Sequence, residues 1–103
     1  MPLTVRVSET NNTVVIHITG RFDFNLHRDF RHAYEDVQQR LPKPVFTIDL
    51  SGTEYMDSSA LGMLLLLREY AGGDQAAVSI INARPEVKKI LDIANFNRLF
   101  KLG

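Results

Sequence analysis

Cysteine and tryptophan are both absent from this chain of 103 residues. Without cysteine there can be no disulfide, no thiolate chemistry and no cysteine-ligated metal site. An excess of charge of either sign is also missing, since 12 basic residues balance 12 acidic ones. A chain with no basic excess has no electrostatic basis for attracting nucleic acid. The composition therefore excludes disulfide scaffolds and gives no reason to expect direct nucleic-acid binding.

Long apolar runs are missing as well. The run from Met63 to Leu67 is far shorter than the ~20 residues that a membrane-spanning helix needs. The first residues carry no basic segment followed by an apolar one, so no signal peptide is predicted. We therefore expect one cytoplasmic domain, covering residues 1–103, that does not insert into a membrane.

The hydrophobic pattern alternates between the periods of strands and helices. Two alternating segments, residues 3–8 and 14–19, predict a hairpin, and the segment from Gly20 to Phe24 breaks that pattern. Asn25 is expected to cap a helix that Pro42 and Pro44 end. Further along, the sequence predicts a strand over 45–50, a helix over 58–71, a strand over 76–81, a helix from Pro85 and a short last strand within 99–102. Strands that alternate with helices imply an α/β fold, with a largely parallel sheet and an antiparallel edge.

The junction between the central strand and the helix that follows it holds a carboxylate and two hydroxyls. Asp57 is a good helix N-cap, which places Ser58 and Ser59 at the first two helical positions. A helix N-terminus offers free N–H groups and a partial positive charge, so it tolerates a phosphate. From spacing alone, two interpretations remain open. The serines either help to cap the helix or one of them is a site of modification.

The sequence around this junction resembles a known family. The stretch Thr47-Ile48-Asp49-Leu50-Ser51-Gly52, followed by Tyr55-Met56-Asp57-Ser58-Ser59-Ala60-Leu61-Gly62, is similar to the signature of STAS domains (sulfate transporter and anti-sigma factor antagonist). It most resembles the small, free-standing bacterial anti-anti-sigma factors. The segment from Gly20 to Asp23 is similar to a second loop of that family. Ala60 is a departure, since the family often has glycine at that place.

The resemblance implies a STAS fold with a mixed, mostly parallel sheet of four to five strands, an N-terminal hairpin and helices packed against the sheet. It also implies a switch protein and not an enzyme, without a cofactor or a metal. The unphosphorylated form would bind an anti-sigma factor or a GHKL-type serine kinase and so free a sigma factor. Phosphorylation of Ser58 would abolish binding, and a serine phosphatase would restore it. The residues expected to bind the partner are Asp23, Asp57, Ser58, Ser59, Leu61, Gly62 and Met63.

Other interpretations remain open at this stage. A STAS domain can also be an accessory subunit of a lipid-transport ABC ATPase, in which case Ser58 would be structural. A small-ligand sensor is a third possibility, for which the sequence shows no pocket signature. The apolar helix after Ser59 is either deeply buried or leaves Met63 or Leu66 exposed to a partner. His27 and His32 lie five residues apart, a spacing that is poor for a metal site on one helical face. The chain is expected to be a monomer or a weak dimer.

Overall fold

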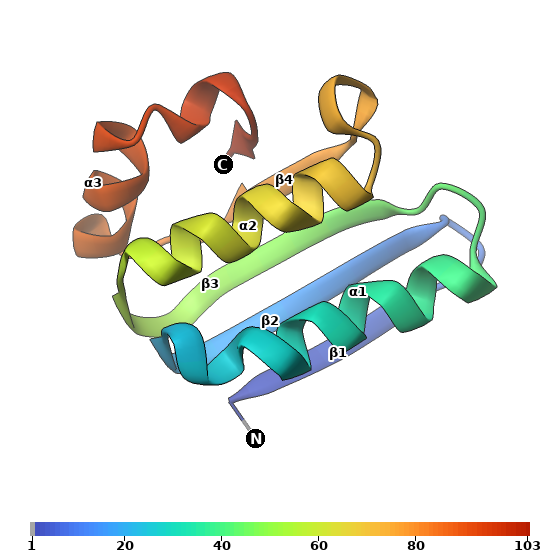
Figure 1. The fold of residues 1–103 in the computed structure, drawn as a ribbon, viewed down its shortest axis with the longest axis horizontal. Coiled ribbons are helices and arrows are strands. Elements are labelled where there is room, and N and C mark those ends of the chain that lie inside the picture. The colour runs from blue at the N-terminus through green and yellow to red at the C-terminus, as the bar shows by residue number, and fades with distance from the viewer. Residues whose placement is uncertain (1) are drawn as a thin grey trace.

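A computed structural model describes residues 2–103 as a single five-stranded sheet whose strand order follows the order of the chain. The first two strands, β1 (Leu3–Ser8) and β2 (Thr13–Phe22), form the antiparallel hairpin. Next to β2 lie three parallel strands, β3 (Val45–Met56), β4 (Val78–Ile81) and β5 (Lys101–Leu102). The predicted α/β class, mixed sheet and N-terminal hairpin are confirmed (Figure 1).

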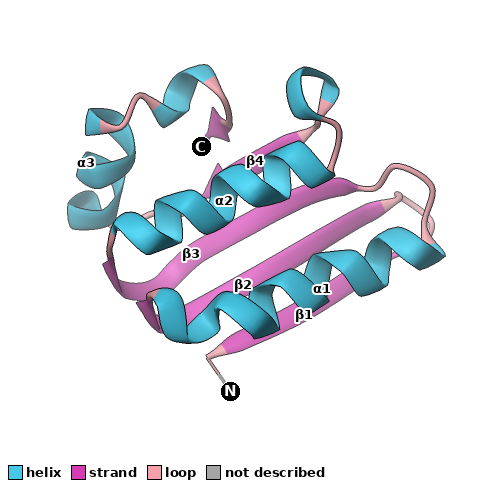
Figure 2. Ribbon diagram, viewed as in Figure 1, coloured by secondary structure: helices cyan, strands magenta, loops and turns pink. Residues whose placement is uncertain are grey.

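Three α-helices connect the parallel strands. They are α1 (His27–Arg40), α2 (Ser58–Tyr70) and α3 (Pro85–Ile93), and three single turns of 3₁₀-helix, η1 (Phe24–Leu26), η2 (Gly73–Gln75) and η3 (Phe96–Arg98), flank them (Figure 2). Right-handed crossovers from β2 to β3 and from β3 to β4 place α1 and α2 on the same face of the sheet. Figure 1 shows α1 and α2 lying side by side across that face. Within residues 2–103, no helix combines the length and apolar character needed to span a bilayer.

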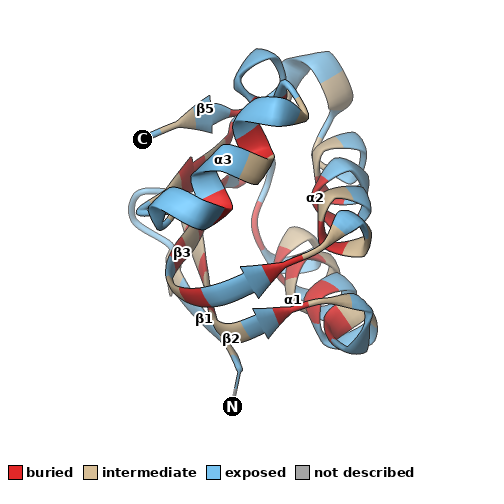
Figure 3. Cartoon of the chain, turned by 90° about the vertical axis from the view of Figure 1, so that its left-hand side faces the viewer, coloured by how far each residue is buried: buried red, intermediate tan, exposed pale blue. Residues whose placement is uncertain are grey.

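The core lies between the sheet and this helical layer (Figure 3). Successive side chains of a strand point to opposite faces, so every second residue of a central strand turns inward. Fully buried side chains accordingly alternate along the two central strands, at Val14, Ile16 and Ile18 in β2 and at Phe46, Ile48 and Leu50 in β3. From the helices, Phe30, Tyr34, Leu64 and Leu67 close the core.

Both central strands continue further than their sequence pattern predicts. β2 runs on through Gly20 to Phe22, and β3 reaches Met56 and not residue 50. The residue numbers of paired residues differ by 32 at Thr13–Val45 and by 34 at Phe22–Met56. β3 therefore contains two extra residues, each of which forms a bulge. Each bulge shifts the phase of the alternation. Gly20, at φ +76°, adopts a conformation that favours glycine beside the second bulge.

The first bulge also explains why Gly52 has no side chain. A Cβ atom at this position would lie 2.6 Å from Cγ2 of Thr19 on the neighbouring strand. The next residue, Thr53, is fully buried, and its hydroxyl donates to the carbonyl oxygen of Ile18 at 2.8 Å. A buried hydroxyl with a partner avoids the cost of desolvation. Gly52 and Thr53 therefore both contribute to the close pairing of β2 and β3 beside this bulge.

Candidate functional site

The candidate site forms where β2 and β3 end together. Phe22 and Met56 are paired neighbours at the carboxyl ends of two parallel strands, and both are buried. Asp23 and Asp57 are the residues that follow them directly. Because the two strands are parallel and in register here, the loops that follow emerge side by side. The two aspartates consequently begin adjacent loops, and Ser58 follows the second.

Asp57 caps α2, as its sequence context predicts. Its backbone is extended, with φ −121° and ψ −174°, and its Oδ1 accepts the N–H groups of Ser59 at 3.1 Å and Ala60 at 3.2 Å. The same oxygen accepts the Ser59 hydroxyl at 2.6 Å. This hydroxyl bond is the main reason that the pKa of Asp57 lies below its ordinary value of 3.8, and the backbone bonds add to the effect. The carboxylate is therefore held in its charged form.

The two serines differ in what their hydroxyls do. Ser59 is partly buried, and its hydroxyl is held by the Asp57 carboxylate. Ser58 is exposed, and among residues 2–103 its hydroxyl has no hydrogen-bond partner. Ser58 is also the first residue of α2, where the free amides and the positive end of the helix dipole lie. Of the two, Ser58 is the hydroxyl that can react without first giving up a bond.

Asp23 caps a helical turn in the neighbouring loop. Its Oδ1 accepts the N–H of Asn25 at 3.0 Å and thereby starts η1, which leads into α1. The expectation that Asn25 is the cap was wrong, because Asp23 starts a 3₁₀ turn before the α-helix begins. Both residue types cap helices, so the sequence alone does not distinguish them. The other oxygen, Oδ2, lies 3.4 Å from Nε of Arg21.

Three residues of α2 beyond the serines were predicted to contact a partner, and their exposures differ. Gly62 is exposed, and a Cβ atom there would meet nothing within 4 Å beyond its chain neighbours and the backbone of its own helix. Leu61 is half-buried against the core. Met63 is only 4% exposed, so the expectation that it forms part of the accessible surface is corrected. Of Met63 and Leu66, only Leu66 remains accessible, with 54% of its surface exposed.

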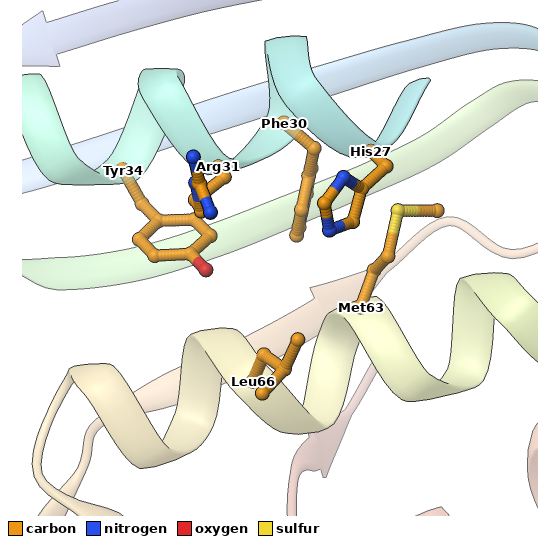
Figure 4. Close-up of a pocket in the computed structure, with 6 residues that line it drawn as sticks. All are labelled: His27, Phe30, Arg31, Tyr34, Met63 and Leu66. Atoms are coloured by element: carbon orange, nitrogen blue, oxygen red, sulfur yellow. The ribbon is translucent and has the colours of Figure 1, made fainter. Parts of the chain in front are cut away.

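Met63 is buried because α2 faces α1 across a tight seam. Figure 4 shows Met63 and Leu66 of α2 pointing toward α1, where His27, Phe30, Arg31 and Tyr34 complete the lining. The cavity between them measures about 10 Å³, which is about the space of one water molecule. Ligand pockets typically have volumes of ~300–1,000 Å³. This seam joins two helices and does not offer room for a small ligand.

Two aromatic side chains beside the site were missed in the sequence. Phe24 is 66% exposed and stacks on His27, with ring centroids 5.1 Å apart. Tyr55 is 41% exposed, and the guanidinium of Arg21 lies 4.1 Å from its ring centroid. The signal in the sequence that could have identified them is their position, since each lies within two residues of a capping aspartate. Exposed aromatic residues are enriched at protein interfaces, so Phe24 extends the candidate surface. Tyr55 precedes Met56, which turns into the core, so its side chain lies on the face of the sheet opposite the helices.

The fold and the site together define a class of protein. It is a small α/β domain with helices on one face of a mixed sheet, which presents a free serine at a capped helix start beside a second capped loop. A family model described as "Mlab, STAS domain" matches residues 5–102. The chain therefore belongs to the STAS-domain family.

Relatives and solved structures agree with this assignment. A STAS-domain containing protein of Pseudomonas aeruginosa (strain UCBPP-PA14) is 50% identical over 103 residues, which is the full length of both chains. The anti-sigma F factor antagonist of Paenibacillus polymyxa is 25% identical over 99% of this chain and 85% of its own length. Among solved structures, this chain superposes on SpoIIAA, an anti-sigma factor antagonist of Bacillus in its unphosphorylated form, with a TM-score of 0.81. The two sequences are 18% identical, and the match covers 98% of this chain and 87% of SpoIIAA. This structural likeness shows the shared fold.

Proposed function

We propose that this protein is an anti-sigma factor antagonist whose binding is switched by phosphorylation of Ser58, and that it is not itself an enzyme. The observation that carries the proposal is the difference between the two serines. Ser58 is exposed and unbonded at the first position of α2, while the Ser59 hydroxyl is held by Asp57. The relatives named as antagonists support an anti-sigma factor as the partner. The partner that adds the phosphate would be a GHKL-type serine kinase. A serine phosphatase would reverse the modification.

The charge that a phosphate adds explains why the switch would act on binding and not on folding. Phosphorylation adds about −1.5 to −2 charges. The positive end of the α2 helix dipole stabilises this added negative charge by about 0.3–1 kcal/mol. Asp57 and Asp23, on the two adjacent loops, oppose the new charge by on the order of 1–4 kcal/mol for a close pair in partly solvated surroundings. In free protein the exposed phosphate stays hydrated, so the fold survives.

A partner that covers this surface removes that water. A charge left buried without a partner in an interface costs about 2–5 kcal/mol, which weakens binding roughly 30-fold to several thousandfold. Gly62 and Leu66 lie on the exposed side of the same helix, one and two turns after Ser58. Phe24, in the adjacent loop that Asp23 begins, is also exposed. A surface with a free hydroxyl amid exposed apolar groups is suited to a contact that a phosphate disrupts.

The proposal is tested with three baits that differ only at the serines, Ser58→Ala, Ser58→Asp and Ser59→Ala. Each is used to capture proteins from a lysate of the source bacterium, and the prey are quantified by mass spectrometry. An anti-sigma factor or a GHKL-type kinase should be enriched on Ser58→Ala and on Ser59→Ala and depleted at least roughly tenfold on Ser58→Asp, about 1.4 kcal/mol. Circular dichroism should show equal folding of all three.

Two results would contradict the switch. Equal recovery of one partner on all baits would remove Ser58 from the interface, and transport ATPase subunits among the prey would identify an accessory subunit instead. In a second assay, the captured kinase and Mg-ATP should label Ser58 in the parent chain. Peptide mapping that finds phosphate on Ser59 alone would show that the hydroxyl held by Asp57 is the one modified.

A further inference from the structure

The outer edge of β1 carries unpaired backbone groups whose positions follow from the hairpin register. Leu3 pairs with Ile18, so Pro2 stands opposite Thr19, and the Thr19 N–H donates to the Pro2 carbonyl at 2.8 Å. In an antiparallel ladder, hydrogen-bonded pairs alternate with pairs whose backbone groups point away. The bonds to β2 therefore come from residues 2, 4, 6 and 8. The N–H and C=O groups of Leu3, Val5 and Val7 point outward from the sheet.

This edge has few of the features that normally prevent pairing. Exposed edge strands are usually kept very short, interrupted by bulges or proline, or protected by several charges. β1 has six residues in uninterrupted register with β2, is rich in valine and carries one charged residue, Arg6. Among residues 2–103, no strand or helix hydrogen bonds to its outer side. The backbone groups thus form a template for a further strand.

We propose that this edge binds a second copy of the chain, with the two β1 strands antiparallel about a two-fold axis at Val5. In this register residues whose numbers sum to ten stand opposite each other, so Leu3 pairs with Val7 of the second copy and Val5 with Val5. All three outward-facing residues of each strand then hydrogen bond. A register centred on Arg6 uses fewer of these residues and sets the two guanidiniums against each other. A register centred on Thr4 is less favourable too, because it leaves Val7 without a partner among residues 2–103.

The side chains are compatible with this register on both faces of the sheet. On the helix side, Leu3, Val5 and Val7 would form one apolar strip across the axis, and Val5 is 37% exposed in the single chain. On the other side, each Arg6 faces Thr4 of the second copy, so no like charges meet directly. The surface is therefore complementary to itself, as a two-fold interface requires.

The helix that flanks this edge has a compatible order of charges. α1 faces α2 with His27 and Arg31. On the opposite side, where Ala33 packs on the core, helical spacing puts three charged residues, which are Asp29, Asp36 and Arg40. The two-fold axis makes the α1 helices of the two copies antiparallel. Asp29 of each copy is then directed toward the end that carries Arg40 of the other. Ser58 follows β3, two strands away from this edge, so the dimer leaves both candidate switch sites accessible.

Disulfide trapping tests the axis directly, because the chain contains no cysteine. Across a hydrogen-bonded antiparallel pair the Cα atoms are about 5.5 Å apart, which suits a disulfide. Val5→Cys should therefore form a covalent dimer under mild oxidation. Ser8→Cys is the matched control on the same strand. Its two copies would lie roughly 20 Å apart, at ~3.4 Å per residue, and should stay unlinked. Equal trapping of both variants would indicate random collision and overturn the proposal.

Sedimentation across a concentration series provides the second test. The parent and Val5→Thr, which keeps a β-branched side chain, should associate in the same concentration range. Val5→Lys places two ammonium groups together at the axis and should remain a monomer throughout, with an unchanged circular dichroism spectrum. A parent chain that is monomeric at every concentration, or a Val5→Lys variant that dimerises as well as the parent, would refute the β1 interface. Neither result depends on phosphorylation of Ser58.

Discussion

Gly62 offers a prediction in which stability and binding change in opposite directions. It lies within α2 and is exposed, and a Cβ there would meet nothing within 4 Å beyond its chain neighbours and the backbone of its own helix. A glycine inside a helix destabilises it by roughly 0.5–1 kcal/mol relative to alanine. The Gly62→Ala substitution should therefore raise the melting temperature by about 2–8 °C in a domain of this size.

Binding should respond in the opposite sense. Gly62 lies one turn after Ser58 on the same side of α2, where the proposed partner approaches. A methyl group forced into a close contact costs about 1–3 kcal/mol, which corresponds to a roughly 5- to 150-fold weaker complex. The assay combines calorimetric titration with the partner captured on Ser58→Ala and thermal unfolding of the free chain.

A control variant separates this effect from a general change in helix stability. His32 is exposed on α1, on the side turned away from α2, and His32→Ala should raise stability by a few tenths of a kcal/mol through helix propensity alone. Its affinity for the partner should equal that of the parent. If Gly62→Ala is more stable and still binds like the parent, no partner approaches this turn of α2 closely, and the proposed surface is misplaced.

Three further predictions concern the junction of β2 and β3. Ser59→Ala removes the main cause of the low Asp57 pKa, so this pKa should rise in a carboxyl-carbon NMR titration, and a pKa that stays put would contradict the observed hydrogen bond. Because a lowered carboxyl pKa stabilises the fold above the unfolded value, the parent should lose this contribution as pH falls below about 4. Gly52→Ala should lower the free energy of unfolding by about 1–3 kcal/mol, measured in urea, since its methyl would clash with Thr19. Asp23→Asn keeps a capping oxygen and should change stability by less than about 0.5 kcal/mol. It should nevertheless weaken partner binding, and unaltered affinity would leave Asp23 a purely structural cap.

The order of strands and helices was predictable from hydrophobic periodicity, but the ends of the central strands were not. Alternation is read by counting residues, and each of the two bulges of β3 adds a residue that shifts this count. The segment from Gly20 to Phe24 breaks the alternation in the sequence, and the strand was therefore expected to end before it. In the structure the positive φ of Gly20 lets β2 bend and continue beside the second bulge.

At the candidate site, local chemistry was easier to predict than accessibility. The cap at Asp57 follows from residue type and position, since an acceptor placed before a helix satisfies free amides. The different roles of Ser58 and Ser59 depend on a rotamer, and the burial of Met63 depends on α1 lying over α2. Met63 and Leu66 are equally apolar in the sequence, and only the position of the neighbouring helix decides which one is covered.

The strand order has a consequence for how the chain folds. Within residues 2–103, each of the five strands hydrogen bonds to the strand that precedes or follows it in the sequence, and no strand crosses over another. Every pairing therefore closes a loop no longer than one helix and its connections, which keeps the entropic cost of each step small. Chains dominated by such short-range pairings fold faster than sheets of the same size built from distant segments. The hairpin of β1 and β2 can form first, and each later helix–strand unit can then add to an existing edge. β5, which has two residues and joins last, should be the first strand to lose amide hydrogen-exchange protection.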